Sequence, residues 1–142
     1  MNDERPPHHR LGLIGLVALG GALGTGVRAV LTDLVPAVDG VSWAVLGINV
    51  VGAFCLGLLL DVLARRGPDV GHRRTVRLFV GTGVLGGFTT YSALADDTAR
   101  LLDAGRWAAS SGYVLLSVLL GLAAVVAGLW TAGRLRGQER AR

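Results

Sequence analysis

The stretch GVLGGFTTYS, residues 83–92, decides the fold of this chain. It lies within residues 78–95, a run without charged side chains that is about as long as a helix that crosses a bilayer. Three glycines, two threonines and a serine are poorly suited to a helix surrounded by lipid, because glycine loosens the backbone and the freed carbonyls need polar partners. We therefore predict a transmembrane helix that breaks near mid-membrane, where transport proteins tend to place ions.

Three further charge-free runs, residues 11–27, 40–60 and 107–133, are also near or above the length that spans a membrane. With 51% hydrophobic residues, 17% charged residues and a mean hydropathy of +0.54, the composition is that of a membrane protein. We predict an all-α membrane protein with four transmembrane helices in one domain, residues 11–133. The first helix is expected to continue past Arg28 to about Val35, which favours an uncleaved span over a signal peptide. Residues 1–10 are expected to form a disordered tail, and residues 134–142 a basic tail.

The basic residues are all arginines, fourteen in number, and they are unevenly distributed. Eleven stand in the two tails and in the connection between the second and third spans, whereas Arg28, Arg100 and Arg106 stand on the other side. Since arginine-rich short connections stay in the cytoplasm, we expect one orientation in the plasma membrane with both termini cytoplasmic. The pI of about 10.5 then reflects membrane orientation, and no nucleic-acid partner is predicted.

Polar and small side chains within the spans mark candidate positions for packing or binding. Asn49 is the only amide within any span, so it faces either other helices or a pore, where its N–H groups can bind an anion. Tyr113 and Ser117 share one face of the last span, which serves either packing or the same pore. Gly20 and Gly24 have the spacing typical of closely packed helices.

The predicted break adds a second kind of site. Gly86 and Thr89 are placed to leave backbone carbonyls without helical partners, and converging carbonyls can hold a small cation. Thr90 and Ser92 add hydroxyl donors. Arg28, near the end of the first span, either reaches the membrane surface or attracts an anion to a vestibule.

Taken in order, these motifs resemble those of the Fluc (CrcB-type) fluoride channels. The resemblance covers residues 20–128 and rests on four patterns: Gly20-Gly21-x-x-Gly24-x-x-x-Arg28, Asn49-x-x-Gly52-x-Phe54, Gly86-Gly87-x-Thr89-Thr90-x-Ser92 and Tyr113-x-x-x-Ser117. It implies a small four-helix subunit that pairs antiparallel with a second one, with two narrow pores along the interface. It also implies a structural sodium ion held by the main-chain carbonyls of Gly86 and Thr89.

By the same resemblance, Arg28 stands in a vestibule, and seven residues line the pores or bind the anion: Asn49, Thr90, Tyr91, Ser92, Leu94, Tyr113 and Ser117. The chain departs from the family pattern at three positions. Family members typically have phenylalanines where Tyr91 and Leu94 stand, and commonly a threonine where Val45 stands. Tyrosine keeps an aromatic ring edge, whereas leucine offers neither a donor nor a quadrupole.

The arginine distribution bears on the expected partner. Members of the resembled family that form homodimers insert in both orientations and carry little arginine bias, whereas its heterodimers combine two chains of opposite bias. The bias and the departures together lead to the hypothesis that this chain pairs with a homologous partner in the bilayer, with a homodimer as the alternative.

The function implied by the resemblance is a fluoride-specific channel subunit that lets cytoplasmic fluoride leave the cell passively and so reduces its toxicity. No nucleophile–base constellation or metal-ligand cluster points to an enzyme. Two alternatives stay open. One is a non-conducting structural subunit of a heterodimeric channel, which Leu94 and Val45 favour. The other is a small multidrug-type transporter, which needs a membrane-embedded carboxylate that the four charge-free runs lack.

Overall fold

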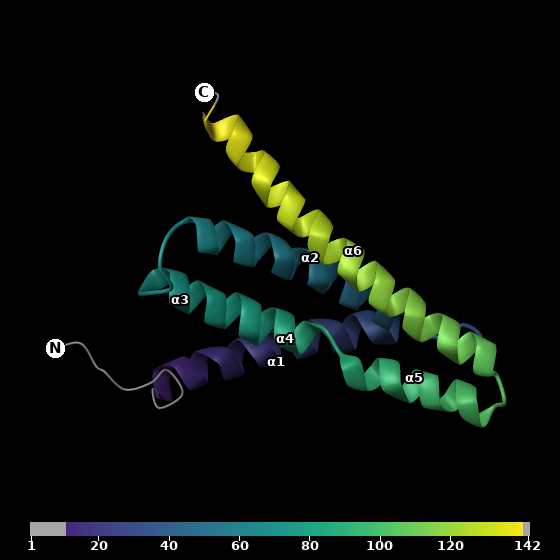
Figure 1. Ribbon diagram of the computed structural model, residues 1–142. Coiled ribbons are helices and arrows are strands. Elements are labelled where there is room, and N and C mark those ends of the chain that lie inside the picture. Colours follow the sequence, from purple (N-terminus) through teal and green to yellow (C-terminus); the bar gives the residue numbers. More distant parts are fainter. Residues whose placement is uncertain (1–10, 141–142) are drawn as a thin grey trace.

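Four long helical segments make up the part of the chain that the computed structural model describes, residues 11–140 with side chains up to Arg134 (Figure 1). They are α1 (Leu11–Leu34), α2 (Trp43–Arg65), a composite third segment, and α6 (Trp107–Arg140). Each contains a stretch long and apolar enough to cross a membrane, so the predicted all-α fold with four transmembrane helices is confirmed. The predicted tail at residues 1–10 lies outside the described residues.

The third segment consists of α3 (His72–Val76), the π-helix η2 (Arg77–Leu85), α4 (Gly86–Phe88) and, after a break, α5 (Tyr91–Asp103). The break is formed by Thr89 (φ −77°, ψ 155°) and Thr90 (φ −148°, ψ 125°), which both have extended backbones. Figure 1 shows the ribbon leaving the helical path here before α5 begins. The predicted break is therefore confirmed. The π-helical turns were not predicted, and such turns are often found near functional sites.

The helices are longer than the charge-free runs that predicted them. Charged residues such as Asp61 and Arg65 lie on the last turns of α2, and Asp96 and Arg100 lie within α5. Both pairs are ion pairs one helical turn apart, with N···O distances of 2.5 Å and 2.9 Å. Because such pairs support a helix, its boundary falls beyond the first charged residue. The last helix, α6, continues through most of the predicted basic tail, to Arg140, and residues 141–142 lie outside the described residues.

Glycines set the contact between α1 and the third segment. A Cβ atom at Gly20 would lie 2.6 Å from the Phe79 carbonyl oxygen, and one at Gly83 would lie 2.9 Å from the Val17 carbonyl oxygen. No side chain larger than hydrogen fits at these distances without moving the backbone. The prediction of close helix packing at Gly20 and Gly24 is thus confirmed.

The contact between α2 and α6 is built in the same way. A Cβ atom at Gly57 would lie 2.7 Å from the Val125 carbonyl oxygen, and one at Gly128 would lie 2.9 Å from the Leu58 amide nitrogen. The described chain therefore contains two helix pairs with touching backbones, α1 with η2 and α4, and α2 with α6.

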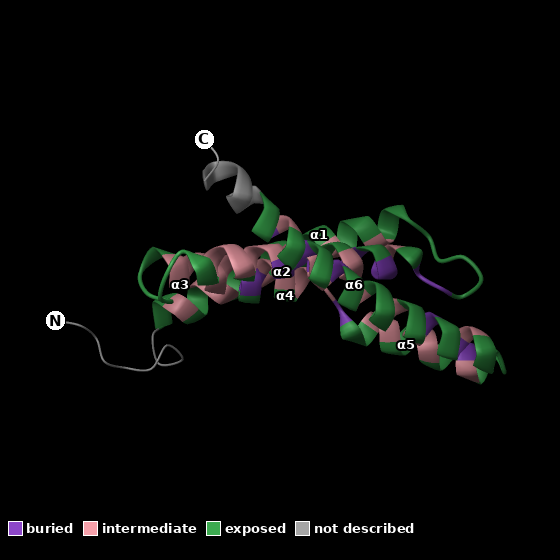
Figure 2. Ribbon diagram, turned by 45° about the horizontal axis from the view of Figure 1, so that its top comes forward, coloured by how far each residue is buried: buried purple, intermediate pink, exposed green. Residues whose placement is uncertain are grey.

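Most of the apolar surface remains uncovered within the chain itself (Figure 2). In the most apolar windows of α1 and α6, only 11% and 6% of the residues are buried. A small buried cluster joins the start of α2 to α5 and α6, and comprises Val41, Leu46, Leu101 and Tyr113. The exposed apolar faces must be covered by lipid or by another protein, because water would leave them unfavourably hydrated.

Tryptophans stand near both ends of α6. At 1.5 Å per residue, the helix between Trp107 and Trp130 is about 35 Å long, close to the hydrocarbon thickness plus part of the headgroup region. The Arg134 guanidinium stacks 3.4 Å from the centroid of the Trp130 ring. Tryptophan and arginine at these positions are typical of residues that anchor a helix at the membrane surface.

Candidate ion site at the helix break

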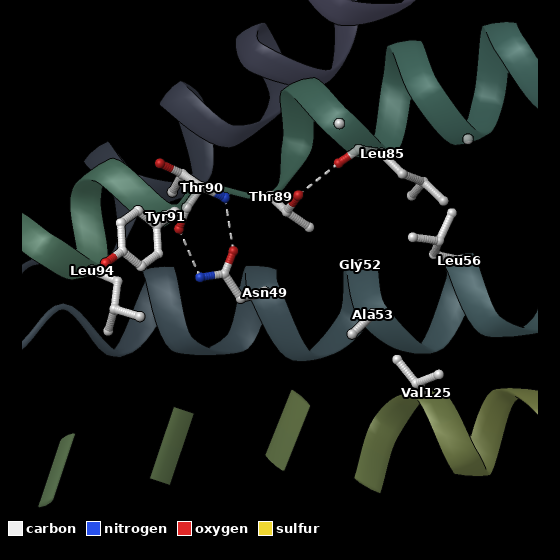
Figure 3. Close-up of a pocket in the computed structure, with 12 residues that line it drawn as sticks. Asn49, Gly52, Ala53, Leu56, Leu85, Thr89, Thr90, Tyr91, Leu94 and Val125 are labelled. Carbon is white, nitrogen blue, oxygen red and sulfur yellow. Dashed lines mark hydrogen bonds between the residues drawn. The ribbon is translucent and has the colours of Figure 1, made fainter. Parts of the chain in front are cut away.

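An open groove of about 370 Å³ lies beside the break (Figure 3). Its walls come from α2, from the third segment on both sides of the break, and from α6. They are mostly apolar, and the polar groups gather near the break. The lining residues are Asn49, Gly52, Ala53, Leu56, Gly81, Leu85, Gly86, Thr89, Thr90, Tyr91, Leu94 and Val125.

The Asn49 amide pairs with the backbone of Thr90 through two hydrogen bonds. Asn49 Nδ2 donates to the Thr90 carbonyl (2.9 Å), and the Thr90 amide donates to Asn49 Oδ1 (2.8 Å). Figure 3 shows both bonds crossing from α2 to the break. Sequence reasoning left open whether Asn49 faces a helix or a pore; the structure shows it bound to the neighbouring segment, and its pore role stays a prediction. It holds the break and also lines the groove, where the second N–H of its Nδ2 is not needed for this pair.

The break diverts two hydrogen-bond donors from their helical acceptors. In an uninterrupted α-helix, the Thr90 amide would donate to the Gly86 carbonyl and the Ala93 amide to the Thr89 carbonyl. Here the Thr90 amide donates to Asn49, and the Ala93 amide donates to the Thr90 hydroxyl (3.3 Å), which caps α5. The Gly86 and Thr89 carbonyls, which the sequence singled out for a cation, are thus among those that lose their helical donors at the break.

Whereas Asn49 contacts the break from α2, Arg28 contacts it from α1. Its Nε donates to the Gly87 carbonyl (3.1 Å), and Thr25 Oγ1 contacts the same oxygen (3.3 Å). Arg28 is half-buried and bound to the third segment, so this contact is neither of the two roles considered from the sequence. The vestibule role stays a prediction.

Tyr91 and Leu94 both line the groove at the start of α5, and Figure 3 shows their side chains next to each other. Tyr91 is 81% exposed, so its ring projects from the chain. Ser92 is exposed as well, and its hydroxyl lies 3.0 Å from the Thr90 hydroxyl. These residues therefore present a polar and aromatic edge to whatever adjoins the groove.

The two predicted residues of the last span are not brought to the groove within this chain. Tyr113 is buried, and its hydroxyl donates to the Ser42 carbonyl (3.3 Å) and to Asp97 Oδ2 (3.4 Å). Ser117 donates to the Tyr113 carbonyl one turn back (2.8 Å). Tyr113 and Ser117 share a helix face, as expected from their spacing, but their pore role stays a prediction. Val45 is also buried, with 2% of its surface exposed.

Sequence reasoning missed Asp97. Its Oδ2 accepts hydrogen bonds from the Ser42 amide (3.1 Å) and from the Tyr113 hydroxyl, so one carboxylate joins α5, α6 and the start of α2. Asp97 stands two residues beyond a charge-free run and was therefore assigned to a connection. Its position in α5, with apolar residues on the same helix, could have been recognised from the helical periodicity of residues 91–103.

These features define a class: a small multi-pass membrane protein whose third span is interrupted, with polar groups from neighbouring helices bound to the interruption. The sequence matches the family model described as "CrcB-like protein, Camphor Resistance (CrcB)" over residues 15–129. The chain belongs to the CrcB family.

Curated relatives agree with this assignment. The chain is 52% identical over 120 residues to "Fluoride-specific ion channel FluC 1" of Cutibacterium acnes. The aligned region covers 84% of this chain and 80% of the relative. It is 54% identical over 114 residues to "Fluoride-specific ion channel FluC 2" of Leifsonia xyli subsp. xyli, covering 80% and 79%. A third relative, "Fluoride-specific ion channel FluC" of Paracoccus denitrificans, is 48% identical over 122 residues, covering 83% and 91%.

Proposed function

We propose that this chain is a subunit of a fluoride-specific ion channel that lets cytoplasmic fluoride leave the cell passively and so reduces fluoride toxicity. The observation that carries the proposal is the polar break in the third span, held by Asn49, in a chain whose relatives are named fluoride channels. A passive channel needs binding groups and a path but no reaction, so the proposed activity is not enzymatic.

The chemistry of the groove suits a small anion. Fluoride is strongly hydrated, so a pore must replace its water with N–H and O–H donors. The second N–H of Asn49 and the hydroxyls of Thr90 and Ser92 are such donors, and the Tyr91 ring offers an electropositive edge. Tyr113 and Ser117 are proposed to extend the path. Leu94 contributes an apolar wall.

A structural sodium ion is proposed at the carbonyls of Gly86 and Thr89. These oxygens fit a hard cation, because they are neutral and their helical donors bind elsewhere. A cation here would lower the free energy of an anion at mid-membrane. Two carbonyls make an incomplete ligand set, so the remaining oxygens are proposed to come from a second subunit.

The second subunit is proposed to pair antiparallel with this chain. The open groove, the exposed Tyr91 and the exposed Gly86 all lie where a second subunit would complete the site. We propose that both termini face the cytoplasm across the plasma membrane, because arginines are concentrated on that side. A chain inserted one way needs an oppositely inserted partner, so a homologous heterodimer is favoured over a homodimer.

A non-conducting structural subunit is the second candidate function. Leu94 offers no donor to an anion, and the buried Val45 presents no hydroxyl. In that case the partner alone would supply the conducting residues. The multidrug-type alternative has no support from the family to which the chain belongs.

The test is fluoride efflux from liposomes, followed with a fluoride electrode. The purified chain is reconstituted alone, and then with a homologous subunit of opposite arginine bias. Efflux that appears in either preparation and is reduced by changing Asn49 supports a conducting subunit. Efflux that needs the partner but is insensitive to changes at Asn49 and Tyr91 supports the structural subunit. No efflux in either preparation contradicts the channel.

A further inference from the structure

Arg28 continues the glycine face of α1. Gly20, Gly24 and Arg28 follow one another at intervals of four residues, so they lie along one side of the helix. At Gly24 the backbones touch: an added Cβ atom would lie 2.8 Å from the Phe88 amide nitrogen. One turn further along α1, the Arg28 side chain reaches the last turn of α4, where its Nε donates to the Gly87 carbonyl (3.1 Å). The glycines therefore set the distance at which the arginine can bind.

The Gly87 carbonyl receives two donors from α1, Arg28 Nε and Thr25 Oγ1. In a continuous helix its donor would be the Tyr91 amide, which the break carries away. Carbonyls at the end of a helix bear partial negative charge, and a guanidinium beside them is stabilising. Arg28 and Thr25 thus replace the lost helical hydrogen bond at the point where the helix ends.

The break is consequently held from two helices. On the side of α2, the Thr90 amide is fixed by Asn49 Oδ1. The Thr90 amide and the Thr89 carbonyl belong to one planar peptide group, so fixing the amide directs the carbonyl the opposite way. On the side of α1, the Gly87 carbonyl is fixed one residue after Gly86. The two carbonyls proposed to bind sodium each adjoin a group that a neighbouring helix holds.

We propose that Arg28 and Thr25 form a clamp that positions the break, and that Arg28 acts through its hydrogen bond to Gly87 rather than by attracting an anion. Where it concerns sodium, this inference rests on the proposed function. That the clamp holds α4 against α1 does not depend on the proposed function, because these hydrogen bonds form whatever the chain transports.

Hydrogen exchange measured by mass spectrometry on the full chain in nanodiscs tests the clamp without any flux. Arg28→Gln removes the charged donor, and Thr25→Val removes the second donor while keeping side-chain volume and net charge. Thr131→Val is the matched control, because the Thr131 hydroxyl binds only its own helix, at the Ala127 carbonyl (2.7 Å). We expect exchange in residues 86–93 to rise roughly tenfold for Arg28→Gln, the loss of one charge-assisted hydrogen bond, and about threefold for Thr25→Val. The control should match the wild type.

Unchanged exchange in both variants would overturn the clamp. Because Thr25 is exposed and its replacement nearly isosteric, the test stands even if Arg28→Gln does not fold.

The dependence of fluoride efflux on sodium separates positioning from anion attraction. For a clamp, both variants raise the sodium concentration needed for half-maximal efflux, and excess sodium restores the wild-type rate. If Arg28 instead attracts the anion, Arg28→Gln lowers efflux only at low fluoride and low ionic strength, and Thr25→Val leaves efflux unchanged. The second pattern would contradict the proposal. Absence of efflux in the wild type would contradict the channel function and leave the exchange result to decide the clamp.

Discussion

Asn49 and Thr90 face each other through hydrogen bonds of 2.9 and 2.8 Å, so one side-chain amide replaces the helical partners of both backbone groups of Thr90. Thr90 is buried, with 8% of its surface exposed, and water cannot easily take over either bond. Asn49 therefore determines where the third span stops being a helix.

Asn49→Ala is expected to lower the free energy of unfolding by about 2 kcal/mol, because it leaves a buried amide and a carbonyl without partners. Thermal unfolding in detergent measures the effect. Thr131→Val, which removes a polar group from the surface of α6, serves as the control. Equal unfolding temperatures for Asn49→Ala and the wild type would mean that the pair does not stabilise the break.

Gly24→Ala is expected to destabilise the chain by roughly 1–3 kcal/mol, because the new methyl group would overlap the backbone at Val84 of η2 and Phe88 of α4. Gly26→Ala is the matched control on the same helix, since nothing lies within 4 Å of a Cβ atom there. It should be neutral or slightly stabilising, as alanine favours helix. The comparison is made by thermal unfolding, and similar losses for both variants would contradict the glycine contact.

Leu94→Phe is expected to increase fluoride efflux from liposomes that contain this chain, because a phenylalanine edge can face an anion where leucine cannot. Leu102→Phe, which changes the same side chain at a position of α5 outside the groove, controls for general effects of added bulk. If both variants behave alike, residue 94 does not face the ion path.

Tags at the two termini should be accessible to protease from one side of the membrane only, because eleven of fourteen arginines lie on the side of the tails. Protease accessibility in sealed vesicles measures the orientation. Replacing the five arginines between the second and third charge-free runs by glutamine should produce both orientations; they are Arg65, Arg66, Arg73, Arg74 and Arg77. Equal populations in the unaltered chain would remove the argument for an oppositely oriented homologous partner.

Asp69, in the connection before α3, gives a small pH dependence of stability. The hydrogen bond from Arg77 (2.6 Å) lowers the pKa of Asp69 below its ordinary value of 3.8. A carboxylate whose folded pKa is depressed stabilises the fold above its unfolded pKa, and that contribution is lost as pH falls through the folded pKa. The unfolding temperature of Asp69→Asn should therefore lie slightly below that of the wild type at neutral pH and approach it below about pH 4. The difference is small because both side chains are largely exposed. A difference in unfolding temperature that grew as the pH fell would contradict a lowered pKa for Asp69.

The helical spans and the break were predictable because their signals are local. Charge-free runs identify spans, and the glycines and threonines of residues 83–92 mark where a helix fails. The second and third spans end later than predicted, since ion pairs such as Asp61 with Arg65 continue a helix past its first charge. The first span ends at Leu34, close to the predicted Val35. The π-helical turns of η2 left no recognisable local pattern.

The contacts of the site were less accessible to sequence reasoning, because they join distant residues. Asn49 and Gly86 were singled out by their residue types, and both line the groove, but the pairing of Asn49 with Thr90 depends on how α2 meets the break. Thr25 and Asp97 were missed for the same reason. Nothing in their immediate neighbourhood indicates that one binds the Gly87 carbonyl and the other the start of α2.

The two halves of the third span belong to different neighbours: η2 and α4 pack on α1, whereas α5 packs on α6. Between them lie only Thr89 and Thr90. The helices thus form two groups, α1 with η2 and α4, and α5 with α6, and α2 contacts both. Any tilt of one group against the other, whether imposed by bilayer thickness or by an adjoining subunit, would act on Thr89 and Thr90, which join the groups within the third span. The groove beside the break, which both parts of the third span line, would then change shape with the tilt of the helices around it.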